Sequence, residues 1–338
     1  MKIKWQWSLD LEAKRLVEMC HHTASDFFRL HHFLPLPFDL NVKRSNTSHH
    51  VYLPNLNYSS IPRFWEEMVR INTLSPIQPN SFDTGLLIPH LKQLELKPLK
   101  LSDLKTIADQ YLPITNDWLK TTFPTLTLPN NVSIILSYFG TGGSFDWSTD
   151  NKDITLSLRH DSDLHVLIEI YLSAILRPQV GNTLYRDWEK SEYLVDYLLL
   201  KSSLSGLLPT PSTWQPTTVP PYFSQKLISE SNSFLQKIGA PNIRSSRFSL
   251  NNNEIYFGKS QLTCFTAKEQ SILTKLISQS PAPLTIDEIA DIIFSSDSKF
   301  SLSAVTKTIE RLRKKLADLG ISSSYIATAS GIGYYLKN

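Results

Sequence analysis

The sequence contains little of what a disulfide-bonded or membrane-spanning protein needs. Its 338 residues include only two cysteines and 11 glycines. Cys20 and Cys264 lie far apart, which argues against a disulfide framework and fits a reducing compartment. The nearest candidate for a spanning helix, Val166–Leu176, contains Glu169 and is too short to cross a bilayer. Since the start of the chain also has no apolar core of signal-peptide length, we expect a cytoplasmic protein without a membrane partner.

An excess of charge is also missing from the chain as a whole, because 34 Lys+Arg face 31 Asp+Glu and the formal charge is +3. The charge is unevenly distributed, however. From Pro241 onward there are 12 basic and 8 acidic residues, a net +4, whereas the first 240 residues hold 22 basic and 23 acidic residues, a net −1. All nine histidines lie at or before His165. These differences predict two domains with different tasks.

Prolines mark the boundary between the two domains. The stretch Leu207–Phe223 contains five prolines and cannot form a continuous helix or a central strand. The next segment, Ser224–Ile238, is typical of a connecting helix that ends at Gly239. We therefore expect an N-terminal domain at 1–206, a linker with a connecting helix at 207–240 and a C-terminal domain at 241–338.

The N-terminal domain shows both helical and strand periodicity, which predicts an α+β fold. Stretches rich in Asn, Ser and Pro at 41–60 and 72–100 indicate long surface loops. The predicted helices are Leu9–Leu30, Pro62–Ile71, Asp163–Leu176 and Tyr185–Lys201, and the predicted strands are Val132–Phe139 and Ile154–Leu158.

Three amphipathic helices are predicted after residue 265. Two of them begin with capping boxes, Thr266–Glu269 and Thr285–Glu288, in which the Thr hydroxyl and the Glu carboxylate satisfy free backbone N–H groups. The third begins near Ser301 and stops at Gly320. Its apolar stripe consists of Val305, Ile309, Leu312 and Leu316.

The opposite face of the third helix is basic. Between Lys307 and Lys315 there are five basic residues and one acidic residue. A helix with a buried stripe and a basic outer face can lie in a DNA major groove, although an ordinary solvated face has a similar composition. At about 100° per residue, the outward positions are Ser303, Lys307, Glu310, Arg311 and Lys314.

Predicted strands flank the three helices. Short strands lie between Arg247 and Thr263, joined by turns at 251–253 and Gly258. After the third helix, the strands Tyr325–Thr328 and Tyr334–Leu336 are joined by a tight turn that contains two glycines. Strands, three helices and a terminal hairpin, in this order, predict a winged helix.

Over residues 245–337 the sequence resembles the C-terminal effector domain of OmpR/PhoB-type response regulators. The matching segments are Phe265–Glu269, Ala304–Val305, Ile309–Leu316, Ile326–Thr328 and Gly331–Tyr334. The resemblance implies binding to double-stranded DNA, commonly by tandem dimers on direct-repeat half-sites. It places Thr306, Lys307, Glu310, Arg311 and Lys314 in the major groove, and Arg313, Thr328 and Ser330 near the DNA backbone or minor groove.

The chain departs from that family in two respects. The family's wing usually carries a basic residue where this sequence has Ser330, so anchoring of the wing in the minor groove is not expected to follow the usual pattern. The family also has a phospho-acceptor receiver domain in front, and its acidic pair, Asp and Lys are not found in the first 205 residues. We therefore do not expect control by a phosphorelay.

Two other N-terminal signals point to ordinary structure. The segment Phe139–Ser144 is glycine-rich but lacks the spacing of a phosphate-binding loop, so a turn at the end of a strand is expected. The pairs His21-His22 and His31-His32 have no recognisable metal-ligand spacing, and we expect them at exposed helix positions.

Residues 132–201 resemble the core of a zincin metallopeptidase of the gluzincin type. Glu192 and Asp196 fit the motif of its second helix, and Glu169 fits the general base of the His-Glu-x-x-His motif on the first. Ile168 and Leu172 replace both His ligands. Because neither side chain has a lone pair to donate, the site as aligned cannot hold zinc.

Three interpretations of this domain stay open. His165, one turn before Glu169, could form a different metal site with Glu169 and Glu192. Alternatively, the domain is an unrelated α+β fold, or a pseudo-metallopeptidase that has lost its metal and serves as a sensor or scaffold.

The sequence as a whole favours a DNA-binding transcriptional regulator that needs no cofactor and has no catalytic residues. We expect it to bind double-stranded DNA as a homodimer, with a protein or small-molecule effector acting on the N-terminal domain. A metallopeptidase fused to a DNA-binding module is the alternative from the enzyme class. A winged helix that binds protein instead of DNA is the third possibility.

Overall fold

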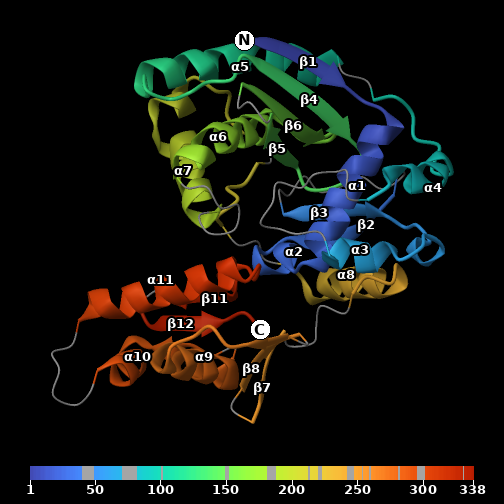
Figure 1. The fold of residues 1–338 in the computed structure, drawn as a ribbon. Helices are drawn as coiled ribbons and strands as arrows, with labels where there is room; N and C mark the ends of the chain where they lie inside the picture. Colours follow the sequence, from blue (N-terminus) through green and yellow to red (C-terminus); the bar gives the residue numbers. More distant parts are fainter. Residues whose placement is uncertain are drawn as a thin grey trace. The chain divides into compact units, whose positions relative to one another are not determined.

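The described chain forms two compact units with the boundary after Pro241 (Figure 1). No helix of this part of the chain is long and apolar enough to cross a membrane. The computed structural model describes residues 1–338 except 40–48, 71–81, 100–101, 149–151, 181–187, 212–213, 220–222, 242–246, 253, 259, 281, 295–300 and 330.

A four-stranded sheet of order β1-β4-β6-β5 organises the first unit. Its strands are β1 (Lys2–Gln6), β4 (Asn131–Ser137), β6 (Asp153–Arg159) and β5 (Gly143–Trp147). The first three are mutually parallel, and β5 pairs antiparallel to β6 at the edge. The two predicted strands correspond to β4 and β6. In both, alternate residues are buried, as expected for a sheet with one covered face.

Three helices share the apolar core with β4 and β6: α5 (Ser102–Thr122), α6 (Leu164–Val180) and α7 (Trp188–Lys201). The Tyr171 hydroxyl on α6 donates to Asn116 Oδ1 on α5 at 2.8 Å, which ties these two helices together. The predicted helices at 163–176 and 185–201 correspond to α6 and α7. Neither α5 nor β1 was predicted.

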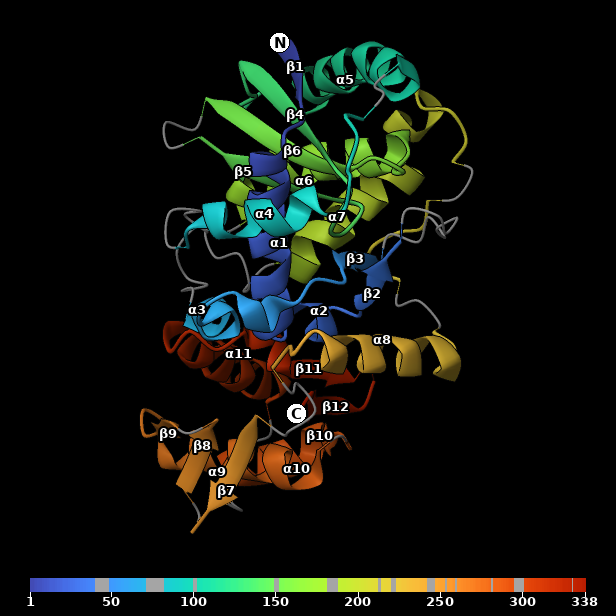
Figure 2. The ribbon, with the colours of Figure 1, turned by 90° about the vertical axis from the view of Figure 1, so that its right-hand side faces the viewer.

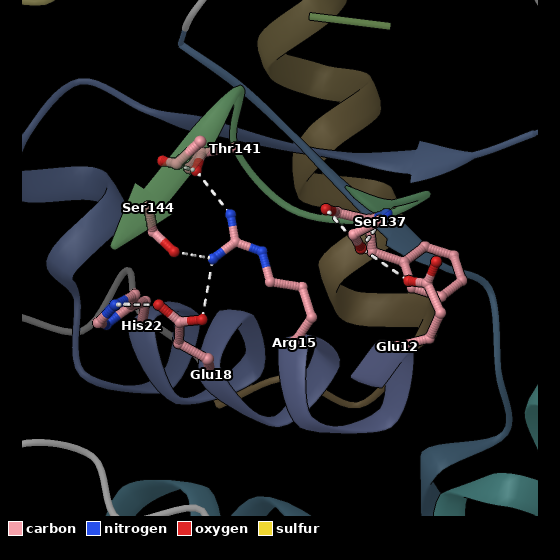
Figure 3. Close-up of polar contacts among 9 residues, drawn as sticks. Glu12, Arg15, Glu18, His22, Ser137, Thr141 and Ser144 are labelled. Carbon is pink, nitrogen blue, oxygen red and sulfur yellow. Dashed lines mark hydrogen bonds and ion pairs between the residues drawn. The ribbon is translucent and has the colours of Figure 1, made fainter. Parts of the chain in front are cut away.

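The helix predicted at Leu9–Leu30 is divided into α1 (Leu9–Ala24) and α2 (Phe27–Leu30). The break lies at Asp26, whose φ of 64° is left-handed. Figure 2 shows α1 running from the β1 end of the sheet to α2. Glu12 anchors α1 to the end of β4, where it accepts from the Ser137 hydroxyl at 2.7 Å and from the Tyr138 N–H at 2.9 Å (Figure 3).

A second, smaller layer of the first unit contains a buried strand where a loop was expected. Strand β3 (His50–Pro54) pairs in parallel with β2 (Leu34–Phe38), and all five residues of β3 are buried. The expectation of a loop over the whole of 41–60 is therefore wrong for these residues. Residues 84–92 of the second expected loop likewise form short helical turns, which end in α4 (Ile88–Lys92).

The connecting helix is α8 (Gln225–Lys237), and it packs within the first unit. The Ser231 hydroxyl donates to the Pro35 carbonyl of β2 at 2.6 Å. The indole N–H of Trp65, on α3 (Phe64–Arg70), donates to the Ile238 carbonyl at 2.9 Å. The part of the expected linker that forms α8 is thus held against this unit.

The second unit has the predicted order of strands, three helices and a hairpin, which confirms the α+β class and the winged helix. Both capping boxes are formed, at Thr266–Glu269 and Thr285–Glu288. A three-stranded sheet is followed by the helices and by a sheet of order β10-β12-β11. The elements are β7 (Phe248–Asn251), β8 (Glu254–Phe257), β9 (Ser260–Leu262), α9 (Ala267–Gln279), β10 (Leu284–Thr285), α10 (Ile286–Ile293), α11 (Leu302–Asp318), β11 (Ile326–Ala329) and β12 (Gly333–Leu336).

An ion pair joins the start of α9 to the last turn of α11. The Lys315 ammonium donates to Glu269 Oε2 at 2.6 Å, and the same oxygen accepts from the Thr266 N–H at 2.9 Å. Burial alone would raise the pKa of Glu269, but the hydrogen bonds from Lys315 and Thr266 outweigh it and lower that pKa below its ordinary value.

We predict that this pair makes the stability of the second unit fall in acid. A carboxylate whose pKa is lower in the folded state stabilises the fold above its unfolded pKa, and this stabilisation is lost as the pH falls through the folded pKa. Hydrogen exchange of α9 amides in the full chain should show lower protection at about pH 3 to 4 than at about pH 7. In Glu269→Gln, protection should be lower near neutral pH and should depend less on pH.

The exposed Asp318→Asn variant is the control, because Asp318 lies at the end of α11 and is exposed. A Glu269→Gln protein with the same pH dependence as Asp318→Asn would contradict the assignment.

Candidate nucleic-acid interface

Helix α11 presents one buried and one exposed face. Its apolar stripe is completely buried. The predicted outward residues are exposed, and Thr306 is half-buried. The exposed charged residues of this face are Lys307, Glu310, Arg311 and Lys314, a net charge of +2. The structure thus brings the predicted major-groove residues together on one surface, and their contact with DNA stays a prediction.

Two of the five basic residues of α11 instead hold the unit together. Lys315 is bonded to Glu269, as described above. Arg313 donates from Nε and Nη2 to the Ile326 carbonyl, at 3.0 and 2.8 Å, and from Nη2 to the Thr328 hydroxyl at 3.1 Å. Its guanidinium also lies 5.7 Å from the centre of the Tyr334 ring. Arg313 therefore ties α11 to the first strand of the hairpin.

The hairpin β11–β12 is the wing. Gly331, at its tip, has a φ of 74°, a left-handed conformation that favours glycine. Ile332 beside it is 50% exposed, and Thr328 is exposed on β11. Ser330, the remaining predicted contact of the wing, lies outside the described residues.

The comparison with known families concerns this second unit. Residues 260–336 match the model of the family "Transcriptional regulatory protein, C terminal". These residues form a transcriptional-regulator C-terminal domain. The match includes α9, α10, α11 and the wing. No curated protein matches the chain.

Among solved structures, the chain is similar to the DNA-binding domain of the response regulator AdeR, which was determined in complex with an intercistronic region. The identity is 25% over 29% of this chain and 99% of that chain, with a TM-score of 0.24. The chain is also similar to the C-terminal domain of the nisin resistance regulator NsrR. The identity is 22% over 28% of this chain and 96% of that chain, with a TM-score of 0.22. For DrrB of Thermotoga maritima, an OmpR/PhoB homologue, the identity is 13% over 67% of this chain and 72% of that chain, with a TM-score of 0.24. With TM-scores this low, the assignment depends on the family match.

The acidic residues that suggested a zincin lie close together in the first unit, but they bind other parts of the protein. Glu169 on α6 accepts from Trp214 and Thr217, and Glu192 on α7 accepts from the Ser173 hydroxyl at 3.2 Å. His165 lies against the Trp214 ring, with 5.8 Å between ring centres. Among the described residues, no group of three His, Cys, Asp or Glu side chains is arranged to hold a metal ion.

The histidine pair of α1 and the pair that follows α2 are largely buried, which corrects the expectation of exposed helix positions. His21, His22 and His31 are at most 8% exposed, and only His32 is exposed. His22 stacks on Phe27 with 4.6 Å between ring centres. Burial lowers the pKa of His22 well below its ordinary value, and the neighbouring His21, Arg15 and His31 lower it further, so the fold favours the neutral ring.

The glycine-rich segment between β4 and β5 packs on Arg15 of α1 (Figure 3). Arg15 donates to Thr141 Oγ1 at 3.1 Å, to Glu18 Oε2 at 2.9 Å and to the Ser144 hydroxyl. Gly140 has a φ of 94°, and a Cβ on it would lie 2.9 Å from Arg15 Nε. Gly140 thus allows a close approach to a buried guanidinium, a role that spacing alone does not indicate.

We predict that Gly333→Ala disrupts the wing. A Cβ at this position would lie 2.1 Å from the Leu284 carbonyl oxygen, a backbone atom of the paired strand. The variant should destabilise the second unit by at least about 1–3 kcal/mol. All seven tryptophans lie at or before Trp214, so tryptophan fluorescence does not report on this unit. Hydrogen exchange of α9 and α11 amides is the appropriate measurement.

Gly206→Ala is the matched control, because a Cβ there has no neighbour within 4 Å among the described residues and the backbone is not left-handed. It should leave exchange in both units unchanged. Equal protection of α9 amides in the two variants would show that the close contact at Gly333 does not affect the stability of the second unit.

Proposed function

We propose that the chain is a DNA-binding transcriptional regulator in which α11 lies in the major groove of its operator. The proposal is supported by the family match over residues 260–336 together with the exposed basic face of α11. A reading helix needs side chains that are free to reach base edges, and Lys307, Arg311 and Lys314 are exposed charged residues on one face of a rigidly packed helix.

The proposed contacts divide into two classes. Lys307, Glu310 and Arg311 would read base edges, and Arg311 has the guanidinium geometry that pairs with the two acceptors of guanine. Ser303, Thr306 and Lys314 would position the helix against the backbone and groove wall. Arg313 on α11 and the wing residues Thr328 and Ser330 would lie near the DNA backbone or minor groove. Because Arg313 already holds Thr328, we propose that it presents this hydroxyl rather than making the main phosphate contact.

We propose that the first unit is a non-catalytic regulatory domain that responds to a protein or small-molecule effector, and that two chains bind adjacent half-sites. The chemistry of α6 and α7 supports a role other than peptide hydrolysis. The aligned ligand positions are occupied by the fully buried apolar residues Ile168 and Leu172, and the carboxylates bind hydroxyl and N–H groups of the same chain.

We predict that Arg311→Ala weakens binding to a selected operator by about 1–3 kcal/mol and relaxes the preference for the base that it contacts. Binding would be measured with the full chain, on an operator obtained by selection from random DNA. Lys275→Ala is the control, since Lys275 is an exposed basic residue of the same unit that lies on α9 and not on α11. It should bind with nearly the affinity and sequence preference of the unchanged protein.

Equal affinity and preference in Arg311→Ala and Lys275→Ala would mean that α11 is not the reader. The salt dependence distinguishes the remaining alternative. Phosphate contacts release counterions and give a steep decrease of affinity with salt, whereas a nearly flat dependence would favour a winged helix that binds protein.

A further inference from the structure

A short segment of the first unit, Trp214–Thr218, covers the carboxylates of α6 and α7. The Trp214 indole N–H donates to Glu169 Oε2 at 2.8 Å, and the Thr217 hydroxyl donates to the other oxygen of Glu169. On α7, Asp196 Oδ2 accepts from the Thr218 N–H at 3.0 Å and from the Thr218 hydroxyl. One segment thus supplies hydrogen-bond donors to acids on two helices.

This segment keeps acidic groups out of water. Glu169, Glu192 and Asp196 are each at most 5% exposed, and Trp214 is 8% exposed. Asp196 Oδ1 is buried without a hydrogen-bond partner among the described residues. A buried carboxyl oxygen without a donor is costly, and opening the segment would let water solvate it.

The electrostatics of the closed site also make burial of the carboxylates unfavourable. Burial raises the pKa of Glu169 to about 8, and the nearby Glu192 carboxylate contributes further. Burial also raises the pKa of Asp196, although Thr218 and His49 act against it. The favourable burial of the Trp214 ring is therefore offset by the cost of burying acids beside one another.

The segment is held mainly by side chains rather than by regular secondary structure. Trp214–Thr218 belongs to no helix or strand, and Pro216 cannot donate a backbone hydrogen bond. The Thr217 carbonyl lies 3.0 Å from His49 Nε2, and the Val219 N–H bonds back to Pro216 within its own turn. The Trp214 ring also packs in the apolar core of the unit, so opening requires this ring and the hydrogen bonds above to be released together, while no hydrogen bond between strands of the sheet has to break.

We propose that Trp214–Thr218 is a latch, which opens from the carboxylates of α6 and α7 while the rest of the first unit stays folded. The open state presents Glu169 and Asp196 to solvent, and the closed state covers them. This device goes beyond the proposed regulatory function and does not depend on DNA binding. It gives the first unit two states that differ in one short segment.

Native-state hydrogen exchange of the full chain tests the proposal. The reporter is the amide of residue 218, because the Thr218 N–H donates to Asp196 only when the latch is closed. We expect this amide to exchange at least about tenfold faster, after correction for intrinsic rates, than the β4 and α6 amides, with almost no dependence on low concentrations of urea. If it shares the protection and the urea dependence of α6, the segment opens only by global unfolding and the proposal is wrong.

Two variants and a matched control sharpen this test. Trp214→Phe removes the donor to Glu169, and Thr218→Val removes the hydroxyl donor to Asp196. Each should speed exchange at residue 218 by about five- to thirtyfold and leave α6 unchanged. Trp118→Phe removes a similar 2.9 Å indole hydrogen bond, to Ser203, elsewhere in the same unit, and it should not change exchange at residue 218.

Should Trp214→Phe unfold the unit, Thr218→Val still decides the question, because its change is smaller and polar. An equal increase of exchange at residue 218 and in α6 in Thr218→Val would overturn the proposal. An increase at residue 218 in Trp118→Phe as large as in Thr218→Val would do the same.

Discussion

The burial of one stripe of α11 determines how the second unit can be used. Val305, Ile309, Leu312 and Leu316 are all fully buried, so the rotation of this helix about its axis is set by packing. Side chains about half a turn away must then face outward, whatever they are. The basic face is a consequence of this constraint, and the ties from Arg313 to Ile326 and from Lys315 to Glu269 fix the helix relative to the wing and to α9.

The same helix shows how much of the exposed charge can be predicted from the sequence. Five basic residues between Lys307 and Lys315 were predictable as a basic stretch. Arg313 and Lys315 border the buried stripe, however, and long side chains at such positions can extend to acceptors on neighbouring elements. Their partners, the Ile326 carbonyl and the Glu269 carboxylate, are distant in sequence. Counting charges therefore overstates the exposed positive charge, and only the tertiary fold shows which cations are already paired.

In the first unit, strands β4 and β6 were predicted, but the long helix α5 was missed although its buried residues Ala108, Leu112 and Leu119 have helical spacing. The alternation in β4 and β6 was readable, whereas β2 carries Pro35 and Pro37, which normally argue against a strand. In the described part of the chain β2 pairs only with β3, so it is an edge strand, where proline is tolerated. Arg159, 1% exposed, joins the two layers by donating to the His50 carbonyl at 2.9 Å. Such a tie has no local sequence signal. The packing of His22 on α1 and of His31, which follows α2, against Phe27 has none either.

The carboxylates of α6 and α7 show most clearly what cannot be predicted from the sequence. Glu169, Glu192 and Asp196 could be selected from sequence because their spacing matched a known pattern, but that pattern said nothing about what they bind here. The partners of Glu169 and Asp196 come from a proline-rich stretch that was expected to be a linker, and hydrogen-bond donors such as Trp214 and Thr218 carry no periodic signal. A cluster of buried acids needs donors from somewhere in the fold. The segment that supplies them here has no regular secondary structure. The hydrogen bonds that stabilise the buried acids therefore also determine the free energy needed to open the segment.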